Sequence, residues 1–150
     1  MTLDLLDIVA RLGAATLIGV LIGINRDITQ KPIGSRTLGL VSLGAASVAV
    51  AGMQVPGMDG DPNAMSRVVQ GIIQGVMGGI SFVGAGVILR DPRNGTVDGL
   101  TTAATVWTTA AIGIGCAFAA WTTVGVATAI ALLLLISQHL LDKFGWRSPE

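Results

Sequence analysis

The sequence predicts an all-α membrane protein, a polytopic bundle of five transmembrane helices. Hydrophobic residues make up 51% of its 150 residues and charged residues only 12%, about half the charged share of a typical soluble domain. The apolar residues are gathered in long runs, and most charges stand in the short segments between them. A membrane span needs about 20 predominantly apolar residues, and the runs reach that length. The 21 glycines suit helices that pack closely inside a bilayer.

Four apolar runs define the five helices. The first three runs stand alone, and the first is interrupted only by Asp7 and Arg11. The last run, from Leu100 to Leu141, is too long for one span and long enough for two. We place its break at Gly113–Cys116, because paired glycines weaken a helix and favour a turn. We expect the whole chain to form one transmembrane domain. The predicted helices are about 5–24, 37–55, 68–89, 100–114 and 117–141.

Lysine and arginine are unevenly divided between the two ends of the predicted helices. With five spans, seven of the nine such residues share the side of the C-terminus. Because cytoplasmic loops are enriched in Lys and Arg, we expect the N-terminus outside and the C-terminus in the cytoplasm. The start of the chain has no basic segment or small-residue cleavage site, so we expect the first helix to be retained. The seven are Arg26, Lys31, Arg36, Arg90, Arg93, Lys143 and Arg147, against Arg11 and Arg67 on the other side.

The charged segment 90–98 contains Asn94-Gly95, a dipeptide typical of two-residue hairpin turns. We expect the chain on either side, near Leu89 and Val97, to pair over a few residues. Thr101 or Thr102 is then predicted to cap the fourth helix.

Five polar side chains are predicted at the outer ends of the first and third helices. Intramembrane charges are costly, and two interpretations stay open. Asp7 and Arg11, four residues apart, either neutralise each other as a pair near the membrane surface or join the others in one polar cavity. Such a cavity would carry more Arg than Asp, which disfavours Mg²⁺, a cation that prefers carboxylates, and favours an anionic lipid headgroup or an acidic partner. The cluster comprises Asp7, Arg11, Arg67, Gln70 and Gln74, of which the last three share one helix face.

Several glycines recur at four-residue spacing, which lets two helix backbones approach closely. Two interpretations again stay open: these glycines pack helices within the bundle, or they form a seam for a second copy or a partner helix. The candidate packing glycines are Gly19, Gly23, Gly71, Gly75, Gly79, Gly84 and Gly86.

The cytoplasmic loops and the start of the fourth helix form a second candidate surface. Topology alone explains its basic residues, yet they also suit anionic lipid headgroups or a cytoplasmic partner. The threonines of the fourth helix either form hydrogen bonds between helices or, because Thr105 and Thr108 share a face with Thr101, line a pathway. This surface comprises Arg26, Arg36, Arg90, Asp91, Arg93, Asp98, Thr101 and Thr102.

No residue pattern points to catalysis or to a cofactor. The formal net charge of zero predicts no nucleic-acid partner. The single cysteine, Cys116, excludes an internal disulfide and a cysteine-based metal cluster. Asp59 and Asp61 in an outer loop form at most a weak divalent site, and His139 suits the membrane interface better than proton sensing. We therefore expect no enzyme, no metal site and no cofactor.

The most specific pattern lies at 84–107, which reads Gly-Ala-Gly, a charged turn, then Gly-Leu-Thr-Thr-Ala-Ala and soon afterwards Trp. Upstream, Leu-Ile-Gly at 21–23 is followed by Arg26, and 31–37 reads Lys-Pro-Ile-Gly-Ser-Arg-Thr. In this order the motifs resemble those of the MgtC/SapB family of bacterial inner-membrane proteins. We expect a short form that lacks the C-terminal cytoplasmic domain of larger members.

The resemblance implies a role in magnesium homeostasis, in adaptation to acid stress and in virulence. It favours a protein that modulates other membrane proteins through helix–helix contacts. The alternative is a small oligomeric transporter or channel for an ion or solute. The segment between Gly75 and Ile88 has no ionisable group, which favours the first. The expected partners are the lipid bilayer and either a membrane protein or a second copy.

Overall fold

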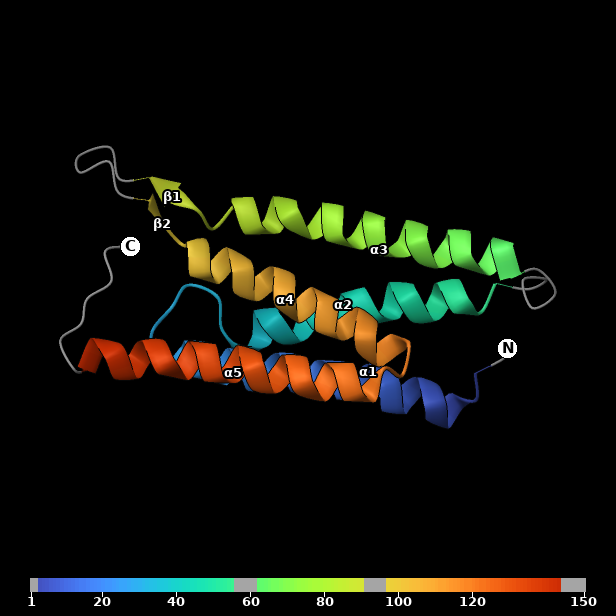
Figure 1. The fold of residues 1–150 in the computed structure, drawn as a ribbon, viewed down its shortest axis with the longest axis horizontal. Helices are drawn as coiled ribbons and strands as arrows, with labels where there is room; N and C mark the ends of the chain where they lie inside the picture. Colours follow the sequence, from blue (N-terminus) through green and yellow to red (C-terminus); the bar gives the residue numbers. More distant parts are fainter. Residues whose placement is uncertain (1–2, 56–61, 91–96, 144–150) are drawn as a thin grey trace.

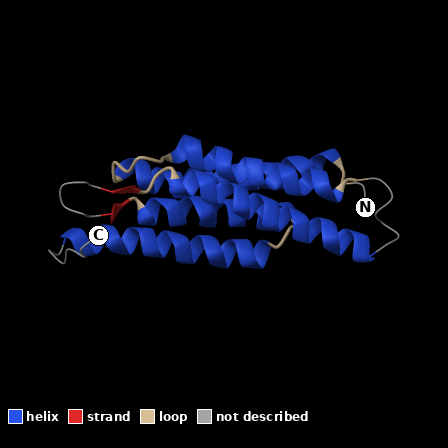
Figure 2. Ribbon diagram, turned by 90° about the horizontal axis from the view of Figure 1, so that it is seen from above, coloured by secondary structure: helices blue, strands red, loops and turns tan. Residues whose placement is uncertain are grey.

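The computed structural model describes residues 3–55, 62–90 and 97–143, which form five helices and one pair of antiparallel strands. The helices run along the long axis of the molecule as an elongated bundle (Figure 1, Figure 2). The all-α, five-helix prediction is confirmed. The elements are α1 (Leu5–Ile28), α2 (Ser35–Met53), α3 (Pro62–Ala85), β1 (Leu89–Arg90), β2 (Val97–Asp98), α4 (Leu100–Ala117) and α5 (Trp121–Lys143).

Four of the helices, α1 to α4, are long and apolar enough to cross a membrane. The described apolar part of α5, Trp121–Ser137, is shorter. Several helix bounds differ from the predicted ones. The third helix begins earlier than predicted, at Pro62, because proline is well suited to the first turn of a helix. It ends at Ala85 instead of residue 89.

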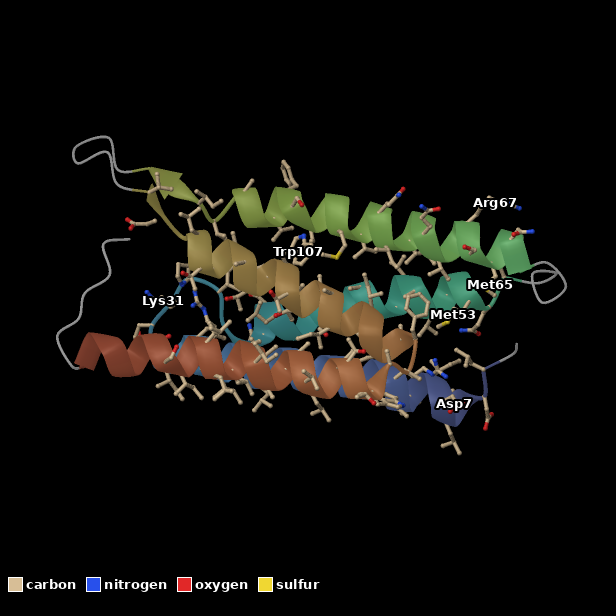
Figure 3. All side chains as sticks on the ribbon, in the orientation of Figure 1. Asp7, Lys31, Met53, Met65, Arg67 and Trp107 are labelled. Atoms are coloured by element: carbon tan, nitrogen blue, oxygen red, sulfur yellow. The ribbon has the colours of Figure 1, made fainter. Side chains whose placement is uncertain are left out.

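Helix α1 begins at one end of the bundle, and α5 ends at the other (Figure 1). One end, called the hairpin end, carries the α1–α2 loop at 29–34, the strands β1 and β2, and the first turn of α4. The other, called the Arg67 end, carries the first turns of α1 and α3, with Arg67 labelled there in Figure 3. Helices α2 and α4 form the centre: α2 packs against α1, α3 and α4, and α4 also packs against α1, α3 and α5.

Close helix packing surrounds Ser42 of α2, a fully buried residue. A Cβ atom added to Gly19 of α1 would lie 2.5 Å from the Leu38 carbonyl oxygen and 2.9 Å from the Ser42 Cβ. A Cβ atom added to Gly113 of α4 would lie 2.4 Å from the Ser42 carbonyl oxygen. Glycine therefore lets α1 and α4 approach the α2 backbone from two sides, close to one residue.

The turn between α4 and α5 lies at 118–120, so the predicted break at Gly113–Cys116 is wrong. Gly113 is buried against α2 instead. The chain turns at Ala119, whose φ of 53° is left-handed. The Ala119 amide donates to the Cys116 carbonyl and the Ala120 amide to the Gly115 carbonyl, both at 3.0 Å. This is the Schellman pattern of a helix end, here formed without glycine.

The strands pair as the sequence predicts, with Leu89 opposite Asp98 and Arg90 opposite Val97. The Asn94-Gly95 turn lies outside the described residues. The prediction that Thr101 or Thr102 caps α4 is wrong, because the N-cap is Gly99, which makes no side-chain cap hydrogen bond. Gly99 has φ of 90°, and a Cβ atom there would lie 2.0 Å from the Val87 carbonyl oxygen. Steric demand, rather than side-chain capping, selects the residue before α4.

Candidate functional sites

The outward face of α3 differs in composition from the outward faces of the other helices. Helix α3 is the least buried of the four candidate spans, and its exposed side chains share one side of the helix. Large aliphatic side chains are fewer there: Ile73 and Val83 are each 41% exposed, and the aromatic Phe82 is 85% exposed. By contrast, α1 and α5 expose Leu, Ile and Val side chains. We call this surface the α3 face; it comprises Arg67, Gln70, Gly71, Gln74, Gly75, Gly78, Gly79 and Phe82, all exposed.

The glycines of the α3 face touch nothing else in the described structure. A Cβ atom added to Gly71, Gly75, Gly78 or Gly79 would meet no described atom within 4 Å. The interpretation that the 71–79 glycines pack helices within the bundle is therefore wrong, and the partner-seam interpretation stays a prediction. A groove of about 680 Å³ runs beside them, between α3 and Val48 of α2, with Arg67 in its lining.

The other candidate packing glycines fall into two groups. Gly19 and Gly23 of α1 lie against α2: a Cβ atom on Gly23 would lie 2.2 Å from the Ser35 Cα. A Cβ atom on Gly84 would make ordinary contact with Ala103 at 3.6 Å, and one on Gly86 would lie 3.4 Å from the Val83 carbonyl oxygen.

The structure does not assemble the predicted outer polar cluster. Asp7 and Arg67 lie at the same end of the bundle but on opposite sides of it (Figure 3). Gln70 and Gln74 are exposed on α3 with Arg67, and α2 and α4 stand between α3 and α1. One cavity lined by all five residues is therefore contradicted.

Arg11 has a local structural role. Its Nη1 donates to the Ala117 carbonyl oxygen at 2.5 Å, in the last turn of α4. A cation is stabilised there because the final carbonyls of a helix lack intrahelical donors and carry partial negative charge. Arg11 thus ties α1 to the end of α4 instead of facing α3.

At the hairpin end, Arg26 of α1 is almost fully buried, at 2% exposure. Its Nη2 donates to the Thr102 hydroxyl of α4, so these two residues of the predicted cytoplasmic surface meet, and both are buried. Of the other predicted residues, Arg36 and Asp98 are exposed and Thr101 is half-buried. Arg90 lies on β1, and Asp91 and Arg93 lie outside the described residues, as do Asp59 and Asp61.

Sequence reasoning missed a contact that fixes the α1–α2 loop. The Ser35 amide, at the start of α2, donates to Asp27 Oδ2 at 3.0 Å. A Cβ atom on Gly34 would collide with the same carboxylate, at 1.6 Å from Oδ1. Asp27 therefore caps α2 from the preceding helix. The available signal was an Asp seven residues before a Gly-Ser pair, which a search for local caps does not detect because the cap residue belongs to another element.

A groove of about 380 Å³ separates α4 from α5, with Ile22 of α1 also in its lining. The threonines predicted to share a face do line it together. Thr105 donates to the Thr101 carbonyl at 2.7 Å and Thr109 to the Thr105 carbonyl at 2.8 Å, so these two hydroxyls are engaged within α4. The remaining lining is apolar. It is lined by Ile22, Thr101, Ala104, Thr105, Thr108, Thr109, Ala127, Ile130, Ala131, Leu134 and Leu135.

Metal-binding residues do not gather anywhere in the described part of the chain: no group of three or more His, Cys, Asp or Glu residues is placed to hold an ion. Cys116 is buried and unbridged.

Long apolar helices, glycine-mediated crossings and charges at the helix ends define a multi-pass membrane protein. Over residues 12–144 the chain matches the model of the MgtC family, and it belongs to that family. It is 40% identical to the protein SrpB of Synechococcus elongatus, in an alignment that covers 95% of this chain and 81% of that protein. No solved structure matches it.

Two further relatives are longer than this chain. It is 39% identical to the protein MgtC of Salmonella typhimurium over 89% of this chain and 52% of that protein. It is 32% identical to the protein SapB of Bacillus subtilis over 72% of this chain and 46% of that protein. The chain thus spans about half the length of these two relatives.

Proposed function

We propose that this chain is a bacterial inner-membrane protein that modulates other membrane proteins by helix–helix contact, through the α3 face. Its action is binding rather than catalysis. Family membership supports a role in adaptation to magnesium limitation or acid stress. We further propose that the bundle is one transmembrane unit with the N-terminus outside and the hairpin end in the cytoplasm. The concentration of Lys and Arg at the hairpin end supports this orientation.

The composition of the α3 face carries the proposal. Lipid tails offer no hydrogen bonds, so an amide side chain in a bilayer is more stable against another helix than against lipid. Gln70 and Gln74 are exposed beside open glycines at four-residue spacing. Glycines let a second helix approach until such amides reach it. A partner helix packed here would satisfy both glutamines and fill the groove beside Val48.

Site-specific crosslinking in bacterial cells tests this proposal. A photoreactive amino acid at position 74 is expected to give a defined adduct with another membrane protein, identified by mass spectrometry. The same probe at Leu133, which is exposed on α5, is expected to give lipid adducts only. Lipid adducts alone at position 74 would refute the α3 face as a contact surface. An adduct between two copies of this chain would replace the partner protein with a homo-oligomer.

Two matched variants show whether the glycines are responsible. Gly75→Leu places a large side chain on the α3 face and is expected to reduce the position-74 adduct at least about tenfold, because helix approach depends on small residues. Gly125→Leu makes the same change at an open glycine of α5 and should leave the adduct unchanged. Equal loss in both variants would point to a general effect on the membrane helices and contradict a specific α3 contact.

The α4–α5 groove favours a second candidate, a transporter or channel, since four threonines line it. Purified protein in liposomes would then carry an ion or solute. Robust flux that Ala131→Phe, a substitution in the groove lining, abolishes would overturn the contact proposal. Absence of flux together with a reproducible membrane partner would overturn the transporter.

A further inference from the structure

We propose that the groove between α4 and α5 binds one acyl chain of an anionic phospholipid, whose headgroup lies at the hairpin end beside Lys31. This inference is independent of the α3 face. It assigns a lipid to a groove that lies on another side of the bundle.

The position of the groove restricts its occupant. Its lining residues all belong to the hydrophobic helices α1, α4 and α5, and three of them, Ala104, Ile130 and Leu134, are exposed to the surroundings. The groove therefore opens sideways into hydrocarbon. Figure 1 shows why it exists: α4 and α5 meet at the turn 118–120 and diverge towards the hairpin end.

The lining of the groove is mainly apolar and favours an apolar occupant. The hydroxyls of Thr105 and Thr109 donate within α4, so their protons are not offered to a ligand. Thr101 and Thr108 also line the groove, and the rest of the lining is Ala, Ile and Leu. A ligand that enters from water would be stabilised by burial of apolar surface. A ligand that enters from the bilayer would be stabilised by close packing against the groove.

The length of the groove matches one leaflet. It follows α4 from Thr101 to Thr109 and α5 from Ala127 to Leu135, which is eight residue steps in each case, or about 12 Å at the helical rise of 1.5 Å per residue. Half of a hydrocarbon core is about 15 Å. Because Thr101 lies in the first turn of α4, the groove occupies the half of the bilayer next to the hairpin end. A single acyl chain fits this length better than a partner helix that spans the whole membrane.

A cation lies at the end of the bundle where the groove begins. Ile22 of the lining is one helical turn before Arg26, whose guanidinium reaches Thr102 of α4. The Lys31 amide donates to the Arg26 carbonyl at 3.0 Å, so Lys31 lies just after the end of α1, at the hairpin end. The Lys31 side chain is exposed at the hairpin end, near the start of α4 (Figure 3). A headgroup phosphate at this level would meet the ammonium group, so an anionic phospholipid is preferred to a neutral one.

Native mass spectrometry of the purified protein tests the site with two probes, phosphatidylglycerol and phosphatidylcholine with identical acyl chains. We expect one phosphatidylglycerol retained per chain. Lys31→Gln should reduce the preference for phosphatidylglycerol about fivefold, the effect of one surface cation near an anionic leaflet. Equal retention of both lipids by the unsubstituted protein, or an unchanged preference in Lys31→Gln, would refute the headgroup assignment.

Filling the groove tests the acyl-chain assignment. Ala131→Phe, and independently Ala104→Phe from the opposite wall, should abolish retention of both lipids. Ala129→Phe is the matched control, since Ala129 is exposed on α5 outside the groove lining. Thermal unfolding verifies that each variant is folded, and Ala104→Phe replaces Ala131→Phe if the latter is not. Retention in the groove variants equal to that of the control, or a bound peptide mass in place of a lipid, would overturn the proposal.

Discussion

Two sets of glycines with the same four-residue spacing have opposite environments in this molecule. Gly19 and Gly23 of α1 lie so close to α2 that any Cβ atom would collide with its backbone. Gly71, Gly75 and Gly79 of α3 have open space beyond them. The spacing indicates that a helix can be approached closely, but it does not indicate by what. The inner set is satisfied within the chain, whereas the outer set leaves a surface that suits a second helix.

The same contrast holds for the outward faces. Helices α1 and α5 present Leu17, Leu21, Ile130 and Leu133 to the surroundings, which are as apolar as lipid tails. The α3 face presents four glycines, two glutamines, Arg67 and a single large apolar side chain, Phe82, instead. A face that only meets lipid gains nothing from amides. An exposed face of a membrane helix can therefore either meet lipid or bind another helix. The chemistry of its side chains distinguishes the two cases.

The largest effect is expected for Gly23→Ala, in the inner set. The new Cβ would lie 2.2 Å from the Ser35 Cα and 2.6 Å from its nitrogen, and backbone atoms cannot move aside as a side chain can. We expect a loss of about 3 kcal/mol of stability, at the upper end for overpacking, measured by denaturant titration in mixed micelles. Gly13→Ala in the same helix, where nothing lies within 4 Å, is the control. A similar small change in both variants would show that α1 and α2 are not in close contact at Gly23.

A smaller loss, about 2 kcal/mol, is expected for Gly113→Ala. Its Cβ would meet the Ser42 carbonyl oxygen at 2.4 Å. The matched control is Gly115→Ala, two residues away, whose Cβ would meet only a methyl group of Val124 at 2.9 Å. That methyl can move when the side chain rotates, so the control should lose less than half as much. The reverse order in the same titration would mean that α4 packs through a different face.

These two glycines also show how far the sequence alone can predict the structure. The lengths of the apolar runs and the positions of the charges predict five helices. A bilayer requires apolar spans of about 20 residues, and charged residues are placed in the loops between them. The glycine pair at 113 and 115 misled the prediction of the turn, since a glycine that breaks a helix and one that packs it look identical in one sequence. The turn at Ala119, with its φ of 53°, carries no local signal.

The candidate sites were predicted less well for the same physical reason. The contact between Arg26 and Thr102 joins residues 76 positions apart, and both had been assigned to one surface from topology. The prediction of one cavity lined by Asp7, Arg11, Arg67 and the two glutamines was wrong. Residues at equal depth in the membrane need not face each other, because depth does not determine which faces of two helices are in contact. Neighbour relations between helices depend on side-chain packing, which hydropathy does not encode.

A gain in stability is expected for Ser42→Ala, a change at the α2 residue against which Gly19 and Gly113 pack. The Ser42 hydroxyl is fully buried and has no hydrogen-bond partner among the described residues. An unsatisfied buried hydroxyl is destabilising, so its removal should raise stability by about 1 kcal/mol. Ser81→Ala serves as the control, because that hydroxyl donates to the Met77 carbonyl at 2.9 Å on an exposed face, and should change stability little. A loss at Ser42 would reveal a water bound at the helix crossing.

The smallest effect on the fold, and the sharpest test of the comparison, is expected at Gly75 in the outer set. Ala at this position meets nothing within 4 Å and favours the helix, so the stability of the isolated chain should stay the same or rise by about 0.5 kcal/mol. Crosslinking from position 74 to a partner should instead fall stepwise from Gly through Ala to Leu, because each added atom holds a second helix further away. Thermal unfolding and adduct yield, measured on the same three proteins, must therefore diverge. If they fall together, the outer glycines support the fold in the same way as the inner ones, and the contrast between the two sets is wrong.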